Sequence, residues 1–193
     1  MRRTLLTAAL AGVALSGCFG GASAPSELLT LTAASPRQPA QPRTAQQGQM
    51  ITVTTPTVPQ AVRTKRVPVY VSPTVIQYLE GAHWVEGPNE LFRHLLSETI
   101  AARTTLTVLD PSVYTQIQGM VMSGQLVRFG LDPNAMEVVV EFEATLVRPQ
   151  NVVATNRFQA RVSVAEASAA AVAPALNQAA NDVAGQVASW VGG

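Results

Sequence analysis

The strongest constraint on the fold is an alternation of apolar and polar side chains between residues 137 and 164. Successive side chains of a β-strand point to opposite faces of a sheet, so this alternation predicts two strands that share one apolar face. The side chains expected to point into the core are Val138, Val140, Phe142, Ala144, Leu146, Phe158, Ala160, Val162 and Val164. One apolar face requires a covering layer, which the rest of the chain must supply.

Turn residues bound these strands and place them in a three-stranded meander. Residues 119–129 are expected to form its first strand, and turns are expected at residues 131–134 and 149–151, which hold Asp, Asn and Pro. Folding the second hairpin with its apolar faces matched places Glu143 near Arg157. Opposite charges across a strand pair contribute only about 0.2–1 kcal/mol, but they help to fix the register.

Two segments have the periodicity of amphipathic helices and can cover the apolar face. Residues 88–102 are expected to form the first, because Pro88 suits the first helical position and Leu91 and Leu95 are four residues apart. Residues 171–191 are expected to form the second, with apolar side chains at spacings of three and four up to Trp190. Shorter strands are expected at residues 28–32, 50–54, 67–71 and 104–109.

The N-terminus has the pattern of an export signal. Arg2 and Arg3 precede a short apolar stretch, which is too short to span a bilayer, and the sequence Leu15-Ser16-Gly17-Cys18 follows. This sequence resembles the lipobox of bacterial lipoproteins, in which a diacylglycerol is added to the cysteine and cleavage occurs just before it. We therefore expect a signal peptide at residues 1–17 and lipidation at Cys18, with a covalent diacylglycerol and an N-acyl chain. Phe19 is not the Asp that favours the inner membrane, so the inner leaflet of the outer membrane is the expected location.

These patterns predict an α+β fold: a mainly antiparallel sheet with two helices packed on one face, preceded by the signal peptide and a flexible tether. Residues 18–49 are expected to hold the lipidated cysteine, the tether and a linker rich in Pro and Gln. Residues 50–193 are expected to form the folded domain.

Composition excludes several functions. Loss of Arg2 and Arg3 leaves 11 basic against 12 acidic residues, and the densest basic cluster (Arg63, Lys65 and Arg66) is too small to bind nucleic acid. The single cysteine cannot form an internal disulfide or a thiolate metal site. We expect no catalytic residues, no metal site and no cofactor beyond the covalent lipid.

Two groups of side chains have residue types that occur in catalytic or metal sites. The two histidines, His83 and His94, lack a metal-binding spacing and are expected to be surface or packed residues. Glu141 and Glu143 lie on one strand face with the geometry of paired carboxylates, but a solvated face balanced by arginines is the favoured interpretation.

Several stretches carry a family resemblance: residues 61–67, residues 78–84 followed by Pro88, residues 126–129, residues 146–149 up to Phe158, and residues 175–179 up to Trp190. Together they resemble the auxiliary lipoproteins of ABC-type transport systems. These are the small partners of MCE (mammalian cell entry) lipid transporters and are related to the paraquat-inducible lipoproteins. The resemblance covers most of the mature chain and makes residues 50–193 the auxiliary lipoprotein domain.

The resemblance implies a non-enzymatic accessory lipoprotein that is anchored in the periplasm and docks to or stabilises a lipid conduit. Its partners would be an MCE-domain protein and the ABC permease and ATPase, with phospholipid and further copies of itself as other candidates. Tyr78 and Trp84 are expected to flank a short turn, where Trp84 is either a core anchor or an aromatic contact for a partner or lipid. The alternative function is a structural outer-membrane lipoprotein that supports envelope integrity.

Overall fold

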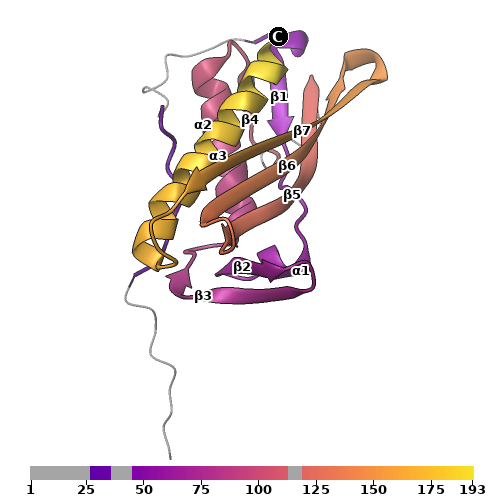
Figure 1. The fold of residues 1–193 in the computed structure, drawn as a ribbon. Helices are drawn as coiled ribbons and strands as arrows, with labels where there is room; N and C mark the ends of the chain where they lie inside the picture. The colour runs from indigo at the N-terminus through magenta and orange to yellow at the C-terminus, as the bar shows by residue number, and fades with distance from the viewer. Residues whose placement is uncertain (1–26, 36–44, 113–118) are drawn as a thin grey trace, which may run out of the picture.

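The computed structural model describes residues 27–35, 45–112 and 119–193. The signal peptide and Cys18 therefore lie outside the described residues. The elements, labelled as in Figure 1, are η1 (Gln47–Gln49), β1 (Met50–Val53), α1 (Gln60–Arg63), β2 (Arg66–Ser72), β3 (Val75–His83), α2 (Pro88–Arg103), β4 (Thr107–Leu109), β5 (Met120–Asp132), β6 (Glu137–Arg148), η2 (Pro149–Asn151), β7 (Val152–Ser163) and α3 (Ala169–Gly192).

The described residues form one seven-stranded sheet around the long strand β5. On one side, β5 pairs with β6, and β6 pairs with β7. On the other side, the start of β5 pairs with β1, and its end pairs with β2 through Val69 and Leu131. Strand β4 extends the sheet beyond β1, and β3 extends it beyond β2.

The sheet is mixed, which corrects the expectation of a mainly antiparallel sheet. The pairings β1–β4, β1–β5 and β2–β5 are parallel, whereas β2–β3, β5–β6 and β6–β7 are antiparallel. Parallel neighbours need a long crossover connection, and α1, the β2–β3 hairpin and α2 all lie between β1 and β4. The alternation of apolar and polar residues within one strand does not show which distant strand it pairs with. The sequence therefore predicted only pairings between strands that are neighbours in the chain.

The expected meander is confirmed, including its register. Val140 pairs with Ala160, Phe142 with Phe158, and Glu143 with Arg157. The turn between β6 and β7 places Gln150 and Asn151 at φ 65° and 62°, a left-handed conformation that Asn tolerates better than most residues. The first strand of the meander, β5, begins at Met120 and ends at Asp132, three residues beyond the predicted end, so the turn expected at residues 131–134 begins only after Asp132.

The two expected helices are confirmed as α2 and α3, which lie side by side on one side of the sheet (Figure 1). Pro88 starts α2, and the Ser168 hydroxyl caps α3 by accepting a hydrogen bond from the N–H of Ala171 at 3.3 Å. Helix α2 makes an aromatic contact with the sheet: Phe92 packs on Phe142, with the ring centroids 5.3 Å apart. Burial of these apolar faces, at about 25 cal/mol per Å², is the main term that stabilises the fold.

Candidate functional site

The first described segment is held firmly on the domain, close to where the expected lipid anchor joins it. The N–H of Leu29 donates to the carbonyl of His83 at 2.7 Å, and the N–H of Val85 donates to the carbonyl of Leu29 at 2.9 Å. Leu29 and Trp84 thereby form an isolated bridge, where the sequence predicted a strand at residues 28–32. Leu29 also packs against the hydrophobic core.

Two asparagines of α3 hold the same segment farther along. Asn177 accepts a hydrogen bond from the N–H of Thr32 at 2.9 Å, and Asn181 accepts one from the N–H of Ala34 at 2.7 Å. Asn181 also donates to the carbonyl of Thr32 at 2.9 Å. The segment thus runs in the same direction as α3, with its first residues toward the start of that helix. The periodicity of residues 171–191 predicted the helix that carries both asparagines, but it did not indicate the segment that they bind.

The structure separates Tyr78 from Trp84. Both belong to the β3 region, a nine-residue strand that ends at His83, so the expected short turn is wrong. Gly81, at φ 70°, interrupts the strand with an irregularity that no alternation could reveal. Tyr78 is partly exposed, and the guanidinium of Arg66 lies 4.5 Å from the centre of its ring.

Trp84 is a core residue. Its side chain is 1% exposed, and its ring lies 5.3 Å from that of Phe129. Its Nε1 has no hydrogen-bond partner among the described residues, which is unusual for a buried indole. The geometry therefore favours the core anchor over the partner contact, and of the two aromatic residues only Tyr78 can reach a partner from the surface.

A groove of about 500 Å³ lies where α1, the β2–β3 hairpin and β5 meet. Apolar side chains, among them Val62 and Ile76, form part of its wall. Arg128 lies over the ring of Tyr70 at 4.5 Å and pairs with Asp132 at 3.7 Å. The sequence did not reveal this groove, because α1 and the β2–β3 hairpin supply one wall and β5, which comes much later in the chain, supplies the other.

The Tyr70 hydroxyl lies inside this arrangement. Burial raises the pKa of Tyr70 above its usual value of 10.0, although the hydrogen bond from the N–H of Phe129 (3.2 Å) and the Arg128 cation act in the opposite direction. The hydroxyl therefore stays protonated at neutral pH and serves as a hydrogen-bonding group. Because Arg128 is already paired with Asp132, the groove is better suited to binding an apolar group than to catalysis.

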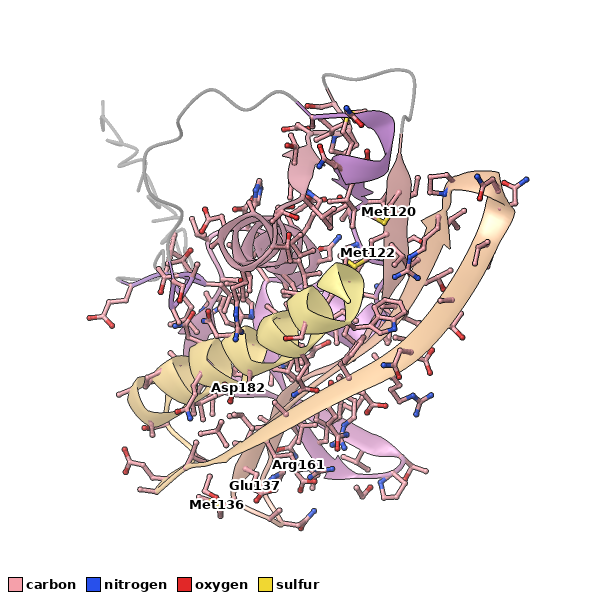
Figure 2. The ribbon with its side chains drawn as sticks, turned by 90° about the horizontal axis from the view of Figure 1, so that it is seen from above. Met120, Met122, Met136, Glu137, Arg161 and Asp182 are labelled. Atoms are coloured by element: carbon pink, nitrogen blue, oxygen red, sulfur yellow. The ribbon has the colours of Figure 1, made fainter. Side chains whose placement is uncertain are left out.

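The outer face of β6 and β7 carries the carboxylates that the sequence singled out. The guanidinium of Arg157 contacts the carboxylates of both Glu143 and Glu141, the latter at 3.0 Å. The guanidinium of Arg161 lies 3.5 Å from the carboxylate of Glu137 (Figure 2). Glu143 also raises the pKa of Arg157 above its usual range. These carboxylates are balanced by arginines, as predicted. Glu141, however, is buried, whereas the sequence predicted a solvated side chain.

The histidines are placed apart. His83 ends β3, whereas His94 lies on α2 with its Nε2 at 3.2 Å from a guanidinium nitrogen of Arg93. Within the described residues, no three His, Cys, Asp or Glu side chains gather as a metal site would require. Across the same residues, no helix has the length and apolarity needed to span a membrane.

These features define a class of protein: an α+β domain whose outer β6–β7 face carries arginine–glutamate pairs and whose first described segment is held on its last helix. Solved structures that share this fold include the following two. A DUF330-family protein from Xanthomonas campestris has a TM-score of 0.72 and 18% identity over 86% of this chain and 95% of its own. An uncharacterised protein has a TM-score of 0.64 and 13% identity over 86% of this chain and 99% of its own.

The family follows from the sequence match. The model of the family described as "ABC-type transport auxiliary lipoprotein component" matches residues 29–188, so the chain belongs to this family. The match begins at the residue that is held against His83 and Val85, and it ends within α3. The resemblance drawn from the sequence is thereby confirmed at the level of the family. No curated protein matches the chain.

Proposed function

We propose that this protein is a non-enzymatic accessory lipoprotein of an MCE-type lipid transport system, which docks to or stabilises the periplasmic lipid conduit. The observation that carries the proposal is the family match over residues 29–188, which names an auxiliary component of ABC-type transport. The partners are an MCE-domain protein and the ABC permease and ATPase. Phospholipid is the cargo of the system, and further copies of the chain can join the assembly.

The anchor of this function is Cys18, with a diacylglycerol and an N-acyl chain that hold the protein in the inner leaflet of the outer membrane. Each buried CH₂ contributes about 0.8 kcal/mol to membrane binding, so two or three chains anchor a protein durably. The held segment at Leu29–Ala34 supports this role, because a force or displacement at the anchor reaches the domain through defined hydrogen bonds.

The surfaces support docking rather than catalysis. The carboxylates on the outer face are paired with arginines, and Arg128 in the groove is paired with Asp132. A general acid or base must be free to contact a substrate, and these carboxylates instead contact arginines. Tyr78, which is partly exposed at the edge of the sheet, remains our candidate contact for a partner or lipid.

The test is extraction of a tagged full-length protein from native membranes in mild detergent, followed by mass spectrometry of the proteins and lipids that co-purify. We expect an MCE-domain protein, a permease and phospholipid above the level found with an unrelated tagged lipoprotein. The matched control is Cys18→Ser, which keeps the sequence of the domain and should lose the lipid, so that the protein is no longer anchored in the outer membrane. Recovery of the lipidated protein alone, even after crosslinking, would favour a structural envelope lipoprotein instead.

A further inference from the structure

We propose that the end of the molecule formed by the β2–β3 hairpin and the start of the held segment rests on the lipid surface, so that the domain has one fixed orientation on its membrane. This inference rests on the lipid anchor of the proposed function and adds the surface that meets the bilayer. The contact is made by four exposed apolar side chains, Leu28, Val75, Ile76 and Val85, which we call the membrane-contact residues.

The direction of the held segment locates the anchor. Thr32 bonds to Asn177 and Ala34 to Asn181, so Glu27 lies at the end of the molecule where α3 starts. Residues 19–27 can span at most about 30 Å between Cys18 and the domain. The 24 residues of α3 span about 36 Å, so the end that holds the C-terminus lies beyond that reach. Figure 1 shows β3 and the start of the described chain at the same end, opposite the C-terminus.

Most of the strongly exposed large apolar side chains of the described residues lie at this end, as two separate pairs. Six large apolar side chains of the described residues are strongly exposed, and four of them are the membrane-contact residues, which are 44% to 54% exposed. The other two, Val152 and Val153, belong to the far tip of the β6–β7 hairpin. Single exposed apolar residues are ordinary, but a group beside a lipid anchor supplies the apolar contact of an interfacial surface.

The membrane-contact residues occupy both ends of strand β3. Val75 and Ile76 begin the strand, and Val85 follows its last residue by two positions, next to Leu28. Nine residues of strand span about 30 Å, so two separated contact points prevent the domain from rocking about its tether. Between them the strand carries polar residues such as Gln77 and Glu80, which suit lipid headgroups and exclude deep insertion.

Charge contributes little to this contact. Lys65 and Arg66 lie at this end, with the Lys65 ammonium 2.9 Å from the carbonyl of Val85. Glu27, Glu80 and Glu86 lie on the same segments and offset them. We therefore expect the contact to depend on the anchor and the apolar side chains, and to be insensitive to the share of anionic lipid.

Fluorescent labelling tests the inference in the full lipidated protein. Cys18 is the only cysteine and carries the lipid, so Val75→Cys, Val85→Cys and the control Val153→Cys each provide one free thiol for an environment-sensitive dye. The proteins are placed on vesicles of phosphatidylethanolamine and phosphatidylglycerol. We expect dyes at positions 75 and 85 to shift to shorter wavelength and to be quenched by nitroxides near the headgroups. The dye at position 153 should do neither.

Three outcomes would overturn the inference. Dyes at positions 75 and 85 that behave as in water, on protein that floats with the vesicles, would leave the anchor intact and remove the contact surface. A wavelength shift without quenching by lipid nitroxides would mean that a protein, such as a second copy, covers this end. A protein that carries no lipid by mass and does not float would remove the anchor of the proposed function together with the surface. Replacing phosphatidylglycerol by phosphatidylcholine should change neither signal.

Discussion

At the scale of single residues, a glycine of β5 lets a neighbouring strand come closer than a side chain would allow. Gly130 is buried, and a Cβ added there would overlap the backbone carbonyl of Pro68 in β2. Backbone cannot move aside as the end of a flexible side chain can. Gly130→Ala should therefore lower the free energy of unfolding by about 1–3 kcal/mol. Chemical denaturation measures this difference.

The matched control is Gly48→Ala, where a Cβ would meet nothing within 4 Å. This change should shift the free energy of unfolding by no more than about 0.5 kcal/mol. If both variants unfolded at the same denaturant concentration as the parent, the close β2–β5 approach would not matter to stability.

Tyr70 gives the molecule a pH dependence in the alkaline range. Its pKa is raised above 10.0 by burial, so the folded state holds the phenolic proton more tightly than the unfolded state. The resulting stabilisation is complete below pH 10.0 and is lost as the pH rises through the folded pKa. Tyr70→Phe lacks this loss, so its free energy of unfolding relative to the parent should rise as the pH increases above 10.0. A pH-independent difference between the two proteins would contradict the burial argument.

At the scale of elements, the attachment of the held segment to α3 depends on Asn181, which makes two hydrogen bonds to that segment. Asn181→Ala should release the amide of Ala34 and speed hydrogen exchange in residues 28–35, while the sheet stays protected. Asp182→Ala is the control, since Asp182 is the exposed next residue of the same helix (Figure 2). Equal exchange in the two variants would show that Asn181 does not hold the segment.

Some of the helices and strands could be predicted from the sequence, and others could not. Regular patterns predicted α2, α3 and the β5–β7 meander, including the pairing of Glu143 with Arg157. Strand β3 was not predicted, because Gly81 interrupts its apolar–polar alternation and the buried Trp84 comes directly after its last residue. The helix α1, with four residues, is too short to show any period.

The parts of the site that the sequence did not reveal depend on tertiary contacts. Tyr70 and Arg128 lie on different strands, and only the parallel β2–β5 pairing brings them together. Asn177 and Asn181 have helical spacing, but their partner is a segment about 145 residues earlier in the chain. Local periodicity carries no information about such distant pairs.

At the scale of the whole molecule, the account requires a mature chain that begins at a lipidated cysteine. We predict that digestion with trypsin yields residues 18–37 as an N-terminal peptide whose mass is raised by a diacylglycerol and an acyl chain, with no peptide from residues 4–17. Cys18→Ser should abolish both the cleavage and the added mass. An unmodified Cys18 peptide in protein from wild-type membranes would contradict the anchor.

Crosslinking in intact cells, before any detergent is added, tests whether this family member serves a lipid transporter. Crosslinked partners of the tagged full-length protein are then identified by mass spectrometry. We predict an MCE-domain protein as the main crosslinked partner, and we predict its loss in Cys18→Ser, which lacks the lipid that would place it at the outer membrane. Crosslinks confined to other copies of the chain or to structural envelope proteins, at wild-type abundance, would contradict this prediction.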